Sequence, residues 1–133
     1  MLFRSADLLS LKNITPLVGR AEEVARDACY REAFDCATAR AVAALPVLTE
    51  LCLPFVKEGG VFVAMKGKGG KEELIAAKSA ISLLGGEARS LTDTPIYSPE
   101  GETFAHTTLL IEKISATPLK YPRAYGKILK APL

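Results

Sequence analysis

Apolar residues recur at helical spacing in three stretches of the chain, and each stretch predicts a helix. The first, 2–11, places its apolar residues on one face. The second, 41–55, is almost wholly apolar and contains Pro46, which allows a kink. The third, 71–84, stops at Gly85-Gly86, a frequent signal for the end of a helix. We therefore expect three helices, separated by segments of a different periodicity.

Those segments are short apolar runs of the kind that form strands. Residues 61–65 are continuously apolar, as in a strand buried in a parallel sheet, and 34–38 also predict a strand. The run 14–18 is shorter and contains a proline, which predicts a weak strand at a sheet edge. Two longer segments, 88–97 and 103–114, flank a turn, so we expect them to pair as an antiparallel hairpin.

The expected elements alternate between helix and strand until the hairpin closes the chain. Such an order indicates an α/β fold with a mostly parallel sheet that helices cover on both faces. With 133 residues, of which 49% are hydrophobic and 24% charged, the chain has the length and composition of one globular domain with a buried core.

Composition argues against a membrane, secreted or metal-binding protein. The longest apolar stretch, 41–56, is interrupted by two prolines and by Thr49 and Glu50, so it is too short and too polar to span a bilayer. Residues 1–10 lack the pattern of a secretory signal. Three cysteines without metal-type spacing are expected to be reduced, semi-buried thiols of a cytoplasmic protein: Cys29, Cys36 and Cys52.

The net charge of +2 conceals an uneven distribution along the chain. Residues 113–133 hold five basic residues and no acidic one, whereas 1–112 hold 12 basic and 15 acidic residues. A weakly acidic body with a basic end indicates a polyanionic partner at that end. The alternative is a solvated tail.

Four segments of the sequence, taken together, resemble one family. In chain order they are Gly19-Arg20-Ala21-Glu22-Glu23, Phe34-Asp35-Cys36-Ala37-Thr38-Ala39-Arg40-Ala41-Val42-Ala43, Glu50-Leu51-Cys52-Leu53-Pro54 continuing through Lys57-Glu58-Gly59-Gly60 to Met65-Lys66-Gly67, and Thr117-Pro118-Leu119-Lys120-Tyr121-Pro122-Arg123. Their order, spacing and coverage of nearly the whole chain are similar to those of the RsmG (glucose-inhibited division protein B, GidB) methyltransferases of bacterial small-subunit ribosomal RNA.

This resemblance implies a fold, an activity and a partner. The fold is a partial Rossmann-like class I S-adenosylmethionine-dependent methyltransferase fold, for which a C-terminal antiparallel hairpin at the sheet edge is characteristic. The activity is transfer of a methyl group from S-adenosylmethionine to N7 of a guanine in 16S ribosomal RNA (position 527 in the usual numbering of that RNA), so the partner is that RNA or the small ribosomal subunit. Residues 1–116 would form an incomplete methyltransferase domain, and 117–133 a basic tail.

Three cofactor contacts carry over from the family by position. Ala21 and Glu22 correspond to the pair at the adenosine end of the cofactor, and Arg40 corresponds to a cofactor-site arginine. Ligands of open α/β sheets bind at the carboxyl ends of strands, where we expect these residues to lie. The alternatives are a helix start for Ala21 and Glu22, and an ion pair of Arg40 with Asp35 or Glu22.

Basic residues in two places are candidates for contact with RNA. Lys66 opens a glycine-rich turn that could hold a phosphate, although the turn lacks the Gly-Lys-Ser/Thr of a P-loop and could be a flexible connection. Near the C-terminus, Tyr121 stands among cations suited to RNA backbone and stacking: Lys120, Arg123, Lys127 and Lys130.

No catalytic residue is assigned from the sequence. The single histidine, His106, is expected to be a sheet residue. Guanine N7 carries a free lone pair, so the proposed reaction needs no general base; alignment and electrostatics suffice.

The family's first two strands, with their glycine-rich turn and ribose-holding acid, have no counterpart in this sequence. In the family these strands lie between those expected at 14–18 and 34–38, so we expect unpaired strand edges and an exposed apolar face. Cofactor binding by the chain alone is then expected to be weak or absent. The chain would then need an N-terminal partner to bind the cofactor, or it would associate with a second copy of itself through the exposed strand edges. A non-catalytic remnant or RNA-binding module is the second hypothesis.

Overall fold

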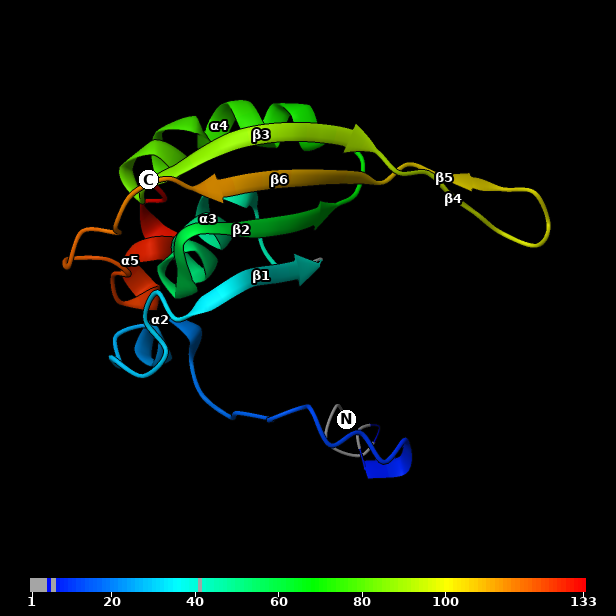
Figure 1. Cartoon of the computed structure of the whole chain (residues 1–133). Coiled ribbons are helices and arrows are strands. Elements are labelled where there is room, and N and C mark those ends of the chain that lie inside the picture. Colours follow the sequence, from blue (N-terminus) through cyan, green and yellow to red (C-terminus); the bar gives the residue numbers. More distant parts are fainter. Residues whose placement is uncertain (1–4, 6, 41) are drawn as a thin grey trace.

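A four-stranded sheet forms the centre of the protein. The computed structural model describes residues 5, 7–40 and 42–133. The strands are β1 (Phe34–Arg40), β2 (Val56–Lys66), β3 (Gly86–Asp93) and β6 (Thr107–Lys113), in the order β1-β2-β6-β3. β1 and β2 are parallel, and β6 is antiparallel to both of its neighbours. The expected α/β fold with a closing hairpin at the sheet edge is confirmed (Figure 1).

The two long helices, α3 (Leu45–Cys52) and α4 (Gly70–Leu83), lie on the same face of this sheet (Figure 1). The connections from β1 to β2 and from β2 to β3 step in the same direction across the sheet, and right-handed crossovers then place both helices on one side. Among the described residues, no helix covers the other face. The expectation of a sheet covered on both faces is therefore wrong for this part of the chain.

The burial of the strands follows from this one-sided cover. In β6, buried and half-buried residues alternate strictly, because successive side chains point to opposite faces. Phe62 and Ala64 of β2 pack with Leu109 and Ile111 of β6 beneath the helices, and none of the four is more than 1% exposed. Leu110, on the opposite face, is only half-buried.

Pro46 is the second residue of α3 and does not kink the helix. It lies in the first turn, where the missing N–H costs no hydrogen bond. The predicted helix over 41–55 is shorter than expected: Ala41 lies outside the described residues, and Leu53–Phe55 form a separate 3₁₀ turn, η1. The predicted helix over 71–84 matches α4 to within one residue at each end.

The C-terminal hairpin is divided into two parts. β3 and β6 pair within the main sheet, from Gly86 opposite Lys113 to Asp93 opposite Thr107. The two-residue strands β4 (Ile96–Tyr97) and β5 (Thr103–Phe104) pair separately and project beyond the sheet (Figure 1). His106 lies between the two parts and outside any strand, which corrects the expectation of a sheet residue.

The strand expected at 14–18 does not form. These five residues are all described, are exposed and belong to no strand. A strand exists only where a neighbour supplies its hydrogen bonds, and no described segment lies in position to do so. The helix expected at 2–11 falls partly outside the described residues. Within the described part of this segment, Ser5, Asp7 and Leu8 are helical.

The basic C-terminal segment, 117–133, is folded onto the domain. Thr117, Tyr121 and Ile128 are buried, and Tyr121 belongs to the main core cluster. Ile128 lies in α5 (Tyr125–Lys130) and packs against Val47 and Leu51 of α3 in a second cluster. This burial excludes a merely solvated tail.

The cysteines differ from the expectation in their exposure. The three cysteines are free thiols; Cys29 and Cys36 are exposed and not semi-buried as expected, whereas Cys52 is partly buried.

Within the described part of the chain, no helix is long and apolar enough to cross a membrane. Nor do the described residues contain a group of three or more His, Cys, Asp or Glu side chains that could hold a metal ion.

Candidate cofactor and RNA-binding sites

Arg40 lies at the carboxyl end of β1, where ligands of open α/β sheets bind. It is exposed and stands opposite Met65 in the parallel ladder with β2. It lines a small cavity of about 190 Å³ together with Lys66, His106 and Thr107. The structure therefore places Arg40 at the predicted edge of the sheet, beside the lysine that was expected to contact RNA.

Lys66, however, is engaged within the protein. Only 9% of this residue is exposed, and its Nζ lies 2.6 Å from the carbonyl oxygen of Ala43 and 2.9 Å from Oε2 of Glu73. Oε2 of Glu73 also accepts the backbone N–H of Leu45 at 2.8 Å. This arrangement ties the end of β2 to the first turns of α3 and α4, so Lys66 stabilises the fold at the site's border.

Ala21 and Glu22 begin the short helix α2 (Ala21–Val24). Only 6% of Glu22 is exposed, and its Oε1 accepts the Nε–H of Arg20 at 2.6 Å. This hydrogen bond raises the pKa of Arg20, whose guanidinium lies 5.1 Å from the ring centre of Tyr125. Arg20, held by Glu22, therefore links the start of α2 to α5, and both helices lie at the end of the sheet where β1 begins (Figure 1).

The three residues expected to bind one cofactor are not brought together. Ala21 lines an apolar pocket with Phe34, the first residue of β1, whereas Arg40 is its last. Seven residues of extended strand span roughly 20 Å. The separation arises because residues 14–18 do not form a strand parallel to β1. Such a strand would have carried Ala21 and Glu22 to the carboxyl end of the sheet.

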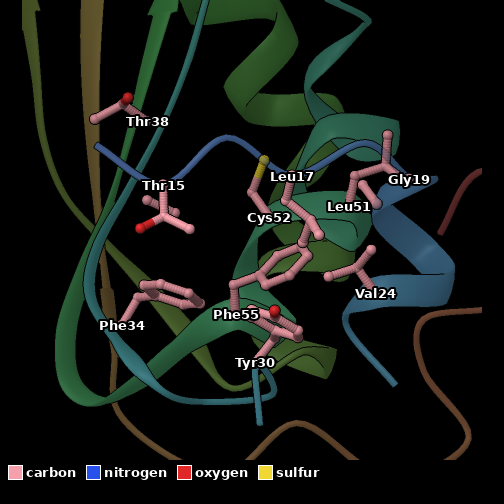
Figure 2. A pocket seen from close by; sticks show the side chains of 12 residues that line it. Thr15, Leu17, Gly19, Val24, Tyr30, Phe34, Thr38, Leu51, Cys52 and Phe55 are labelled. Carbon is pink, nitrogen blue, oxygen red and sulfur yellow. The ribbon is translucent and has the colours of Figure 1, made fainter. Parts of the chain in front are cut away.

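The apolar pocket lies beside β1, which is an edge strand of the sheet. Figure 2 shows Tyr30, Phe34 and Phe55 grouped in the lower part of the view, with Leu17 and Cys52 above them. The pocket has a volume of about 460 Å³, and none of the described residues that line it is charged. A partly open apolar cavity beside an unpaired strand is the kind of surface that a further strand or helix covers in a complete sheet.

Aromatic contacts and a thiol define the character of this pocket. The rings of Tyr30 and Phe34 are stacked with centroids 6.5 Å apart, and Phe34 meets Phe55 edge-on at 6.2 Å. Burial raises the pKa of the Cys52 thiol to about 12, so this group stays neutral. Phe34 is nevertheless 43% exposed, which marks the pocket as incompletely covered.

Arg123, expected to contact RNA, forms the tightest ion pair of the basic segment. Its backbone N–H, Nε and Nη2 all donate to the carboxylate of Glu50, at 2.8, 2.9 and 2.7 Å respectively. Glu50 lies in α3 with no exposed surface. Of the other residues expected to contact RNA, Lys120, Lys127 and Lys130 are exposed.

A second buried network holds the segment 113–121, and sequence reasoning missed it. Lys113, with no exposed surface, donates from Nζ to Oε1 of Glu32 at 2.8 Å and to two backbone carbonyls. Arg31 donates to the carbonyl oxygens of Thr117 and Tyr121, both at 2.8 Å. The only available signal was Lys113 itself, a cation at a position of β6 where the strand's alternation predicts burial.

The chain shares its fold with solved structures of low sequence identity. The chain superposes on precorrin-6y C5,15-methyltransferase from Geobacter metallireducens with a TM-score of 0.59 and 14% identity, covering 86% of this chain and 60% of that one. M. jannaschii TYW2 in complex with AdoMet gives a TM-score of 0.54 and 16% identity, covering 85% and 52%. YcgJ from Bacillus subtilis gives 0.55 and 13%, covering 87% and 77%. The fold is thus that of class I S-adenosylmethionine-dependent methyltransferases.

Sequence comparison narrows this class to one family. The family model described as rRNA small subunit methyltransferase G (GidB) matches residues 2–96, and the chain belongs to this family. Relatives named ribosomal RNA small subunit methyltransferase G are 47% identical in Brevibacillus brevis, 46% in Lactobacillus delbrueckii subsp. bulgaricus and 45% in Clostridium tetani, each over 94% of this chain. The resemblance seen in the sequence is confirmed. The chain spans about half (51%) of the length of these relatives.

Proposed function

We propose that this chain is the C-terminal part of a methyltransferase that transfers a methyl group from S-adenosylmethionine to N7 of a guanine in 16S ribosomal RNA. The observation that carries the proposal is its identity of 45–47%, over 94% of its length, to relatives named ribosomal RNA small subunit methyltransferase G. The substrate is the RNA or the small ribosomal subunit, and the reaction takes place in the cytoplasm.

The chemistry places few demands on protein side chains. S-adenosylmethionine would supply the methyl group. The lone pair of guanine N7 would form the new N–C bond as the S–C bond breaks, S-adenosylhomocysteine would leave, and the positive charge would pass to the base, so no proton has to be removed first. The protein then has to align the two groups and exclude competing geometries. We assign cofactor contacts to Ala21, Glu22 and Arg40 and no general base.

These three residues can serve one cofactor only if the sheet continues beyond β1. Strands paired with the free edge of β1 would give 14–18 a neighbour, and a parallel strand there would end at the carboxyl edge with Ala21 and Glu22 directly after it. The apolar pocket beside β1 and the chain's coverage of about half of its relatives' length support this. We propose that an N-terminal part of the same family supplies these strands, in the same polypeptide or as a partner.

A non-catalytic RNA-binding module or remnant is the alternative function. The distance between Arg40 and α2 favours it, because the described part of the chain forms no single site that includes all three residues. The two proposals differ in one outcome: only the methyltransferase transfers a methyl group once the sheet is complete.

The test is methyl transfer to unmethylated small ribosomal subunits by this chain mixed with the N-terminal half of the Brevibacillus brevis relative. Label from S-adenosylmethionine should appear at guanine N7 with the mixture and not with either part alone. Arg40→Ala should lower the rate at least tenfold, whereas Arg89→Ala, at an exposed arginine of β3, should leave it within twofold. A mixture that binds both RNA and cofactor yet transfers no label would contradict the proposal and favour the remnant.

A further inference from the structure

A groove with cationic walls lies beside the basic C-terminal segment, at the end of the molecule opposite Arg40. It has a volume of about 450 Å³, and six residues line it: Arg26, Lys120, Tyr121, Arg123, Ala124 and Lys127. Four of the six are cations and none is an acid. Residues far apart in the sequence therefore build one positively charged surface, which the charge of the C-terminal segment alone does not reveal.

Arg26 joins the groove because it is anchored to the C-terminal segment. Its Nη2 donates to the carbonyl oxygen of Pro122 and lies 3.5 Å from that of Lys120. Backbone carbonyls satisfy part of the guanidinium but carry no net negative charge, so its positive charge is not neutralised. The groove thus gains a cation that no ion pair in the described structure cancels.

The four cations differ in their availability. Arg123 is neutralised by the buried carboxylate of Glu50, so its contribution is to fix the segment's position. Lys120 and Lys127 are exposed and take part in no ion pair of the described residues. Lys120 Nζ lies 5.2 Å from the ring centre of Tyr121, which holds the ammonium over a rigid, buried platform.

Acidic residues do occur nearby, but they stand in the adjacent hollow. Glu22 is buried and bonded to Arg20, and Glu23 lies 3.9 Å from the same guanidinium. These two carboxylates therefore weaken Arg20 as an anion contact without reaching the lining of the groove. The residues that line the groove are therefore complementary in charge to an anionic ligand.

We propose that this groove, through Arg26, Lys120 and Lys127, binds the phosphate backbone of RNA. The proposal rests on the function proposed above and deepens it, because it assigns an anchoring surface for the RNA substrate. In this structure the groove lies beside the start of β1 and Arg40 lies at the end of that strand, roughly 20 Å away. Lys120 and Lys127 keep this place when the sheet is completed, because Tyr121 and Ile128 anchor their segment to the core. Arg26 follows α2 closely in the sequence, so its contribution belongs to the chain alone, in which the groove is tested. The groove therefore holds RNA at a distance from the reacting guanine and contributes affinity, not chemistry.

The test is binding of a fluorescent single-stranded RNA oligonucleotide to the purified chain, without cofactor, as a function of salt. Lys120→Ala with Lys127→Ala should weaken binding at least tenfold at low salt and reduce the slope of log affinity against log salt by about 1.4, the value for two lost phosphate contacts. Lys12→Ala with Lys78→Ala removes two exposed lysines elsewhere and should change affinity less than twofold. Arg26→Ala is measured separately, with its folding checked by circular dichroism.

Three results would overturn the proposal. The first is absence of RNA binding by the unaltered chain at low salt. The second is an equal loss in the two double variants, which would mean diffuse attraction. The third is binding to phosphatidylglycerol vesicles that the Lys120/Lys127 variant loses while RNA binding is unchanged, which would assign the groove to an anionic lipid surface. Because no methyl transfer is measured, a positive result here together with a failed transfer assay would refute the proposed function and leave the groove intact.

Discussion

Glu50 shows why a carboxylate occurs in the apolar face of α3. It has no exposed surface, and its carboxylate accepts hydrogen bonds from three N–H donors of Arg123 in the C-terminal segment. Removing the partner leaves a charge buried in a site of low dielectric. From the sequence, Glu50 was only a polar interruption of an apolar stretch, because its partner lies 73 residues away.

Arg123→Ala should therefore destabilise the protein by about 2–4 kcal/mol, somewhat less than a fully buried pair because part of the guanidinium is hydrated. Chemical denaturation measures this change. Lys57→Ala is the matched control, since it breaks the exposed pair with Asp35 and should cause no measurable change. Equal effects in the two variants would contradict the assigned role of Glu50.

Glu32 gives the protein an acid-sensitive contact. Burial acts to raise the pKa of Glu32, but hydrogen bonds from Lys113 and from the N–H of Thr117 outweigh it, so the pKa is lowered from its ordinary value of 4.5. A carboxyl with a lowered pKa stabilises the folded state fully above pH 4.5, and the contribution is lost as the pH falls through the lowered value.

The midpoint of urea unfolding should accordingly fall as the pH is lowered below 4.5. Glu32→Gln should be less stable at pH 7 by about 1–3 kcal/mol, because Lys113 loses a charged partner. The difference between the variant and the unaltered protein should shrink in acid. A difference that stays constant from pH 7 to pH 3 would refute the assigned pKa direction.

At the scale of elements, Gly85 determines how α4 connects to β3. Its φ of +84° is in the left-handed region, and its carbonyl oxygen accepts the N–H groups of Ile114 and Ser115. A Cβ at this position would lie 2.1 Å from the carbonyl oxygen of Ser115. The turn therefore requires glycine for two separate reasons.

Gly85→Ala should lower the melting temperature much more than Gly101→Ala. Gly101 also has a positive φ, +87°, but a Cβ there would meet no atom within 4 Å. Both alanines incur the backbone cost of about 1–2 kcal/mol, and only the first adds a clash with the backbone. Thermal unfolding of the two variants compares them directly, and equal shifts would exclude a role for the clash.

The elements that sequence periodicity predicted correctly are those with partners inside the described chain. α4, the core of β2 and the β3–β6 hairpin all bury one face against neighbours within the chain. The run at 14–18 has suitable residues but no neighbouring strand, so it forms none. α5 was not expected, because its burial depends on contact with α3 and its own sequence is basic.

At the scale of the whole molecule, the same cause separates the predicted cofactor residues. The sequence correctly placed Arg40 at a strand's carboxyl end, and that placement depends only on β1 and β2. Placing Ala21 and Glu22 beside it required a parallel strand at 14–18. Elements whose partners lie within the described chain are therefore predictable from local pattern, whereas the cofactor site also requires a sheet that extends beyond β1.

Calorimetric titration of S-adenosylmethionine tests this central claim most directly. The chain alone should show no micromolar binding, and the chain with the N-terminal half of the Brevibacillus brevis relative should bind the cofactor. Thr38→Lys, at an exposed position of the edge strand β1, should abolish the cofactor binding that the N-terminal half confers. Thr92→Lys, at an exposed position of the opposite edge strand β3, should leave that binding unchanged. Micromolar binding by the chain alone, or a gain that Thr38→Lys leaves untouched, would contradict a cofactor site that β1's free edge completes.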